Sequence, residues 1–265
     1  MKRGDEVRHL FTPNDFSWKM RMRQGAKSFF SETAAADSPQ KERLHWLDTA
    51  PELCLASSPK GDVLIQDCWK LAADWEMLPT PVSEGNLIDL GRFWEPDFIL
   101  LDGATFTLAA GCVCMASSWD LQDSVGKTLD EIHDRVPGLN RSIGHSITRF
   151  LERIPADQSF YRENWSLTRS NQLNYHPALQ RPRLDSSISP NEIYLRIEHQ
   201  SFVKIPHGVL MGIRINPIAL TELSDEPEIL QGLLQQLSTM PEEVAIYKGL
   251  DAGIEKVIEV ISELI

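Results

Sequence analysis

The order of helical and strand patterns in this chain predicts an α+β fold: a mainly antiparallel sheet with helices packed around it and a helical C-terminus. Two stretches, 97–116 and 191–216, have the pattern of β-hairpins. Helical periodicity dominates the chain after Pro217. Strands and helices therefore occur in runs rather than in strict alternation, which is typical of α+β proteins. A chain of 265 residues is long enough to bury a sizeable core.

The first hairpin is predicted by a turn dipeptide between two apolar runs. Residues 97–101 are apolar after an initial aspartate, Asp102-Gly103 follows, and a second apolar run (TFTLAAGCVCMA) begins at Thr105. Asp-Gly between two such runs is a strong hairpin signal. Because the second run is almost continuously apolar, we expect its strand to be covered on both faces.

The second hairpin, at 191–216, allows a prediction of register. Alternation places Leu195, Ile197 and His199 on one face of the first strand. The returning strand has an apolar face formed by Val209, Met211, Ile213 and Ile215. Matching apolar to apolar predicts a three-residue loop, Pro206-His207-Gly208, with glycine available for positive φ. That register sets Gln200 opposite Arg214 and brings Glu198 within reach of Arg214.

Helices are predicted by spacing and by capping residues. Apolar residues recur at helical spacing over 63–75 and 139–153, and short amphipathic stretches cover 226–238, 241–248 and 251–265. Thr128 and Glu131 form a capping-box pattern, so a short helix is expected to begin there. Residues 79–91 have the Pro, Ser and Gly content of a loop.

Two regions are expected along the chain. Residues 1–92 are polar and mixed, and we expect a helical and irregular arm that packs on the core. Residues 93–265 contain the predicted sheet and the C-terminal helices, and we expect the two regions to form one continuous globular unit.

Composition excludes several classes of partner. The net charge of −12 argues against a nucleic-acid partner, which requires a basic surface. No stretch approaches the ~20 apolar residues that span a bilayer, so no membrane association is expected. The four cysteines show no C-x-x-C spacing, so we expect free thiols and a cytoplasmic protein. The chain has no G-x-G-x-x-G, P-loop, G-x-S-x-G or H-E-x-x-H motif.

His133 is the first candidate for chemistry. It lies at the end of the short helix that begins at Thr128 and must stop before Pro137-Gly138. An imidazole held rigidly in this way can ligate a haem iron. The alternative is a histidine that caps the last carbonyls of its own helix.

His199 is the rival ligand because it projects from the apolar face of a strand. An imidazole without a partner would be unfavourable there. The alternative for His199 is a core histidine with a hydrogen-bond partner. Cys112 and Cys114 share a strand face and could supply a thiolate ligand, although buried cysteines are more often structural.

One aromatic residue and four charged residues complete the candidates. Trp165 alternates onto the same face as Tyr161 and Glu163, where an aromatic ring can form a wall of a small ammonium site or simply pack in the core. The charged candidates are concentrated near apolar strands: Arg162, Arg196, Glu198 and Arg214. The arginines could anchor haem propionates, or the four could form a solvated ladder on the outer sheet face.

Several segments together resemble one family. They are PDFILL (96–101), SSW (117–119), GKTLDEIHDRVPG (126–138), RENW (162–165), LRIEHQSFVKIPHGVLMGIRINPI (195–218) and PEEVAIYKGL (241–250). In order and spacing they resemble the alpha-subunit-like family of haem-dependent oxidative N-demethylases. The resemblance implies a PAS-like fold that binds haem b. It also implies that His133, in the pattern I-H-x-x-V-P-G, is the iron ligand, and that Trp165, Glu198 and Arg214 line the pocket.

The resemblance implies O₂ activation at haem iron and oxidation of a C–H bond next to the nitrogen of a small amine. The electrons would come from a separate reductase of flavin or iron–sulfur type, because this chain has no such signature. Two departures leave the substrate open: Ala116-Ser117 stands where a Pro-Ser pair is typical, and His199 stands where the family often has arginine. The other readings are a haem-binding PAS-like sensor and a non-catalytic binding module.

Overall fold

The computed structural model describes residues 3–30, 39–76, 84–156 and 158–265. Within them lies a seven-stranded sheet with the order β1-β5-β6-β7-β3-β4-β2, and all its neighbouring strands are antiparallel. The strands are β1 (Arg23–Gln24), β2 (Leu55–Ser57), β3 (Asp97–Asp102), β4 (Leu108–Cys112), β5 (Ser159–Thr168), β6 (Tyr194–Ile205) and β7 (Gly208–Ala219). The α+β class is therefore confirmed, and the sheet is consistent with a PAS-like fold.

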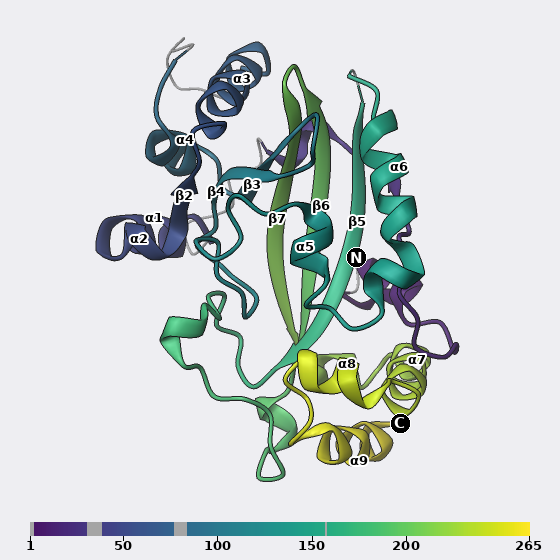
Figure 1. Ribbon diagram of the computed structural model, residues 1–265. Helices are drawn as coiled ribbons and strands as arrows, with labels where there is room; N and C mark the ends of the chain where they lie inside the picture. Colours follow the sequence, from purple (N-terminus) through teal and green to yellow (C-terminus); the bar gives the residue numbers. More distant parts are fainter. Residues whose placement is uncertain (1–2, 31–38, 77–83, 157) are drawn as a thin grey trace.

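The helices surround this sheet (Figure 1). They are α1 (Pro39–Thr49), α2 (Pro51–Cys54), α3 (Gly61–Asp74), α4 (Leu87–Phe93), α5 (Leu129–His133), α6 (His145–Arg153), α7 (Pro227–Ser238), α8 (Glu242–Tyr247) and α9 (Ile254–Leu264). A π-helical turn, η4 (Asn140–Gly144), leads into α6, and short 3₁₀ turns are η1 (Arg3–Glu6), η2 (Arg8–Leu10), η3 (Lys27–Phe29), η5 (Pro177–Leu179), η6 (Pro190–Glu192) and η7 (Leu220–Leu223). α1–α4 lie toward the β2–β4 edge, α6 runs beside β5, and α7–α9 gather at one end.

Most of the predicted helices are confirmed. α3, α6 and the three C-terminal helices lie where the periodicity placed them. The loop predicted over 79–91 is wrong in its second half, because α4 begins after Asn86, whose side-chain oxygen accepts a hydrogen bond from Asp89 N at 2.9 Å. That cap satisfies a free N–H of the first turn of α4. The Pro, Ser and Gly content of the segment had obscured the start of this helix. Residues 79–83 lie outside the described residues.

The first hairpin is confirmed as β3 and β4. The turn is longer than Asp102-Gly103 alone, and Asp102 Oδ1 accepts a hydrogen bond from Thr105 N at 2.9 Å. β4 pairs with β3 on one side and β2 on the other, and all its residues are buried. The strand is therefore covered on both faces, as its continuous apolar run predicted.

The register predicted for the second hairpin is wrong by one residue. β6 and β7 are joined by the two-residue turn Pro206-His207, and His199, not Gln200, lies opposite Arg214. Gly208 does not have positive φ. A Cβ on Gly208 would instead lie 2.0 Å from Leu101 O, so glycine is required by the close approach of β3. The contact predicted between Glu198 and Arg214 is therefore also wrong, since the two side chains lie on opposite faces.

Tertiary contacts explain this register. Asp67 Oδ2 on α3 accepts hydrogen bonds from His207 N at 2.8 Å and from the His207 ring at 2.9 Å, which anchors the turn. With the turn held there, Glu198 lies opposite Ile215 and Gln200 opposite Ile213. This face of the sheet mixes polar and apolar side chains, so apolar matching could not predict the pairing.

The N-terminal arm packs on the same cores as the rest of the chain. Val7, Leu10 and Phe11 are buried in one cluster with residues of α7, α8 and α9. The other end of the sheet is covered by α3, whose Leu64 and Trp69 are buried against β3 and β4. Among the described residues, no helix is long and apolar enough to cross a membrane.

Candidate functional site

A cavity of about 450 Å³ lies between the mixed face of the sheet and the segment that carries α5. β5, β6, β7 and β3 contribute its sheet wall, and residues 115–136 contribute much of the opposite wall. Apolar side chains line both walls, among them Ile99, Ile132 and Ile213, together with His133 and Glu198. Its volume falls in the range of about 300–1,000 Å³ that is usual for cofactor and ligand sites.

Local sequence places α5 and its histidine at this wall. The capping box predicted at Thr128 is present: Glu131 Oε2 accepts a hydrogen bond from Thr128 N at 2.7 Å, and Thr128 Oγ1 accepts one from Glu131 N at 3.3 Å. The chain turns away at Gly138, which has φ +72°. Trp18 of the N-terminal arm donates its indole N–H to Pro137 O at 2.9 Å, which fixes the end of this segment.

His133 is half-buried and lines the cavity. Among the described residues its ring has no hydrogen-bond partner, so the alternative of a histidine capping its own helix lacks the required bond. Burial, and then the positive charge of Arg162, lower the pKa of His133. The imidazole is therefore biased toward the neutral form, which has a lone pair for a metal.

Glu198 lies on β6 among positive charges. It accepts a hydrogen bond from Gln200 Nε2 at 3.1 Å, and its negative charge acts on Arg162, Arg196 and Lys248. Burial lowers the pKa of Arg162, and its Nε has no hydrogen-bond partner among the described residues. A buried N–H without a partner is unfavourable, so an acceptor on a bound molecule would stabilise it.

Arg196 holds the cavity wall together. It is 1% exposed, and its guanidinium donates to Ser117 Oγ at 3.0 Å and to four carbonyl oxygens. These carbonyls belong to Met115, Ala116, Gln172 and Leu173. Its Cζ atom also lies 5.4 Å from the ring centroid of Tyr175. Because its donors are engaged by the protein, Arg196 ties two loop segments to β6.

Trp165 on β5 and Lys248 after α8 contact each other directly. The Trp165 ring packs edge-to-face on Phe11, with centroids 5.4 Å apart, and is largely buried. Lys248 Nζ lies 5.0 Å from the centroid of that ring and 5.6 Å from that of Trp18. Burial lowers the pKa of Lys248 to about 8, although Glu198 partly opposes the shift. Sequence reasoning missed Lys248; the signal available was a lone lysine after the apolar run VAIY.

His199 and Arg214 lie on the other face of the sheet, apart from His133. They border a second, more open cavity of about 660 Å³, which also contacts His9, Arg23 and Glu163. His199 Nδ1 is hydrogen-bonded to Tyr161 Oη, and Arg214 forms an ion pair with Glu95. The structure therefore brings His133, Glu198 and Arg196 to one cavity, with Arg162 close by, and separates His199 and Arg214 from them. Trp165 also borders this cavity, but it pairs with Ile197, so its ring lies on the opposite face of the sheet from Glu198.

The two cysteines considered as thiolate ligands are fully buried in the apolar cluster that includes residues of α3 and α4, and they do not line this cavity. Cys112 Sγ accepts a hydrogen bond from Arg43 at 3.0 Å, and burial raises the pKa of Cys112. A protonated thiol is a poor metal ligand, so the structural alternative accounts for Cys112.

The residues around the first cavity fit the haem that the resemblance implied. The apolar side chains in its walls suit a macrocycle. Within the described residues, the His133 ring has no hydrogen-bond partner and the Arg162 Nε has no acceptor. The described residues contain no group of three or more His, Cys, Asp and Glu side chains that could hold a metal ion. A haem iron, by contrast, needs only one axial side chain from the protein.

One family model matches most of the chain. The chain matches the model of a family described as "haem-dependent oxidative N-demethylase, alpha subunit-like" over residues 65–258. The match includes α5 and its histidine, the strands β3 to β7 that form the cavity, and α8 with Lys248. The chain therefore belongs to the haem-dependent oxidative N-demethylase alpha subunit-like family.

Proposed function

We propose that this protein is a haem-dependent oxidase or monooxygenase that removes a methyl group from a small amine. The observation that carries the proposal is His133, a neutral-biased imidazole that has no hydrogen-bond partner in the described part of the chain and lines a partly apolar cavity containing Glu198. Such an arrangement suits one axial ligand, a macrocycle and a charged co-substrate in the same space.

Each side chain has a proposed role. His133 holds the iron of haem b from the α5 side of the cavity. Arg162 and Lys248 supply positive charge for the propionates, since Arg162 Nε needs an acceptor and Lys248 is a buried ammonium. Arg196 positions the wall rather than the cofactor, because its donors bind the protein. Trp165 holds the Lys248 ammonium through its ring and its carbonyl.

When bound, haem supplies O₂ activation and oxidation of the C–H bond next to nitrogen. The overall reaction consumes the amine, O₂, two electrons and two protons, and yields the demethylated amine, formaldehyde and water. The sequence contains no dinucleotide-binding motif, so the electrons are proposed to come from a separate reductase of flavin or iron–sulfur type.

Glu198 is the proposed contact for the amine. Its carboxylate is half-buried in the cavity, where it can accept a hydrogen bond from a substrate ammonium and fix the direction of the N-methyl group. The apolar side chains in the cavity walls limit the size of the other amine substituents.

The test is an ultraviolet–visible spectrum of the protein after reconstitution with haem, oxidised and then reduced under carbon monoxide. A stoichiometric Soret band that shifts with carbon monoxide is expected, followed by O₂ consumption and formaldehyde release with small methylamines. No Soret band would refute the cofactor and leave a non-catalytic binding module. A shifting band without amine-dependent turnover would favour a haem-binding PAS-like sensor.

A variant at Glu198 tests the amine contact separately from haem binding. Glu198→Gln is expected to keep the Soret band and to raise KM for the amine by roughly tenfold or more, because it removes the charge that pairs with the ammonium. An unchanged KM would show that Glu198 does not contact the substrate.

A further inference from the structure

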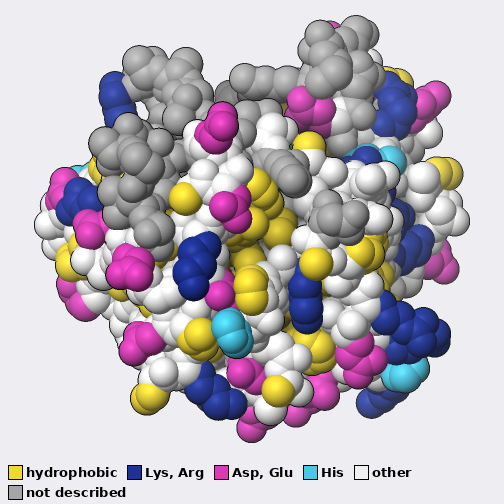
Figure 2. Space-filling model, turned by 90° about the horizontal axis from the view of Figure 1, so that it is seen from above, with side chains coloured by type: hydrophobic (Ala, Val, Ile, Leu, Met, Phe, Trp, Pro, Cys, Tyr) yellow, Lys and Arg dark blue, Asp and Glu magenta, His cyan; other side chains and the backbone are white. Residues whose placement is uncertain are grey.

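The outer surface of η4 and α6 carries a basic stripe: Arg141, His145, Arg149 and Arg153. These four residues are spaced four apart and are all exposed. At this spacing, helical side chains share one face. In Figure 2, Lys and Arg side chains gather at the right-hand edge, the side on which α6 lies in Figure 1.

The three arginines of the basic stripe have no carboxylate partner among the described residues, although the exposed Glu152 lies on the same helix. Arg141, Arg149 and Arg153 form no ion pair with any described residue, although the whole chain has a net charge of −12. Arg149 and Arg153 are four residues apart, and like charges at this spacing destabilise a helix. Exposed charges of one sign along a helix create a local positive potential, which attracts a negatively charged partner.

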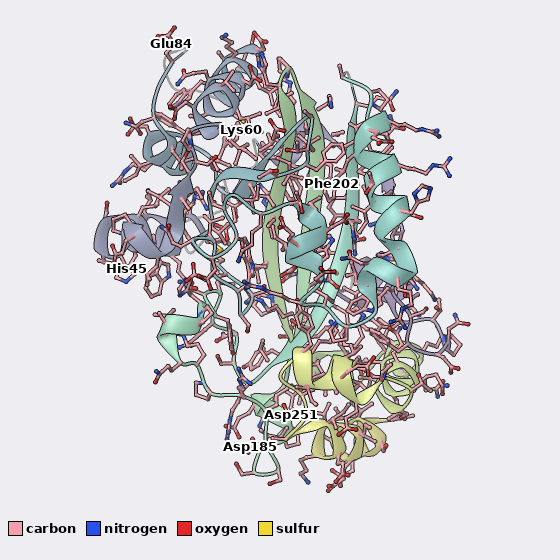
Figure 3. All side chains as sticks on the ribbon, in the orientation of Figure 1. His45, Lys60, Glu84, Asp185, Phe202 and Asp251 are labelled. Carbon is pink, nitrogen blue, oxygen red and sulfur yellow. The ribbon has the colours of Figure 1, made fainter. Side chains whose placement is uncertain are left out.

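A groove beside the basic stripe has the composition of a docking surface. It has a volume of about 360 Å³, its apolar lining is Phe150, Ile154 and Phe160, and Arg149 and Arg153 border it. The floor is packed against the sheet: Phe202, labelled on β6 in Figure 3, packs edge-to-face on Phe150 with ring centroids 5.6 Å apart. Apolar contact surrounded by charge is the usual anatomy of a protein interface.

The basic stripe is also connected to the helix of the proposed haem ligand. η4 follows α5 after Pro137-Gly138, and Asn140 donates hydrogen bonds to Asp130 O at 2.9 Å and to Asp134 Oδ1 at 2.7 Å. A partner seated on α6 would therefore lie beside the segment that carries His133, which suits a protein that delivers electrons.

We propose that the basic stripe and its groove dock an acidic one-electron carrier protein that supplies electrons to the cavity. The inference rests on the proposed function, which requires electrons from a separate protein. Attraction between opposite charges accelerates the encounter, and the small apolar floor lets the carrier leave after each transfer.

The test is direct binding, measured by calorimetry with two acidic carriers as probes, a plant-type [2Fe–2S] ferredoxin and a flavodoxin. The variant Arg141→Gln, Arg149→Gln, Arg153→Gln removes three charges. The matched control Lys60→Gln, Lys70→Gln, Arg183→Gln removes three charges from exposed sites away from α6; Lys60 is labelled in Figure 3 at the opposite side of the sheet. Circular dichroism confirms that both variants are folded.

We expect at least one carrier to bind at low salt, more weakly at about 0.15 M salt, and about tenfold or more weakly to the stripe variant while the control binds like the parent. Equal loss in the control, or no salt-sensitive binding of either carrier, would overturn the proposal. Because this measurement needs no haem, its outcome is independent of the Soret band, whose absence would refute the proposed function separately.

Discussion

Lys248 Nζ donates a hydrogen bond to Trp165 O at 2.8 Å and lies 5.0 Å from the centroid of the Trp165 ring. One side chain thus binds both the backbone and the side chain of a single residue. Lys248 follows α8, whereas Trp165 lies on β5, so this contact joins the C-terminal helices to the sheet beside the proposed haem cavity.

The buried ammonium of Lys248 predicts a pH-dependent stability. Its pKa falls from the ordinary 10.5 to about 8 in the folded protein, chiefly through burial. Between these values the unfolded chain binds more protons than the folded one, so the free energy of unfolding rises with pH over this range. Lys248→Met removes that titration. We expect the free energy of unfolding of the parent, minus that of the variant, to increase by on the order of 2–3 kcal/mol from pH 8 to pH 10.5. Urea unfolding at each pH measures this difference.

Lys256→Met is the matched control, since Lys256 lies at the surface of α9 and pairs with Glu259 at 2.6 Å. The free energy of unfolding of the parent, minus that of Lys256→Met, should not rise over the same pH range. A flat difference for Lys248→Met as well would show that the Lys248 ammonium is not desolvated.

The two histidines on opposite faces of the sheet predict different effects on haem binding. His133→Ala is expected to abolish the Soret band after reconstitution, because it removes the proposed axial ligand, while thermal unfolding changes little. His199→Ala should retain the band, since His199 borders the other cavity. The reverse result, with the band lost only in His199→Ala, would transfer the ligand assignment to His199.

The contacts of Arg196 predict that even a conservative substitution strongly reduces the stability of the protein. Arg196→Lys keeps the charge but cannot reach the carbonyls on two loop segments at once, which leaves buried acceptors unsatisfied. We expect a loss of about 3 kcal/mol in the free energy of unfolding. Arg183→Lys, at an exposed position, should be close to neutral. A loss for Arg196→Lys below about 1 kcal/mol would contradict its role in the wall.

Gly208 predicts a steric effect at the turn between β6 and β7. In Gly208→Ala the new methyl group would lie 2.0 Å from Leu101 O, so β3 and β7 must separate locally. The expected loss of stability is about 3 kcal/mol or more, measured by thermal and urea unfolding.

Gly144→Ala provides the comparison, because its Cβ would lie 3.4 Å from the nearest atom, Asn140 Oδ1, in a helical backbone. That variant should be neutral or more stable by up to about 1 kcal/mol. Equal stability of the two alanine variants would mean that Gly208 is not required by the approach of β3.

Local features of this protein were determined by its sequence alone. The capping box of Thr128 and Glu131, the Asp-Gly turn and the helical periodicity of α3 depend on residues only a few positions apart, so each pattern predicted its element. Alternation also predicted which side chains share a face, including Trp165 with Glu163 and His199 with Ile197. The resemblance of short motifs selected His133, and the structure places it at the cavity.

Tertiary structure alone decided how these elements meet. The β6–β7 register depends on Asp67 binding His207 and on β3 approaching Gly208, both contacts between segments distant in sequence. This register placed Arg214 on the face of His199 and Ile213 on the face of Glu198. The Lys248 ammonium is desolvated where Trp18 and Trp165 converge on it. Burial and strand pairing depend on residues that are distant in sequence, so a periodic pattern along the chain cannot predict them.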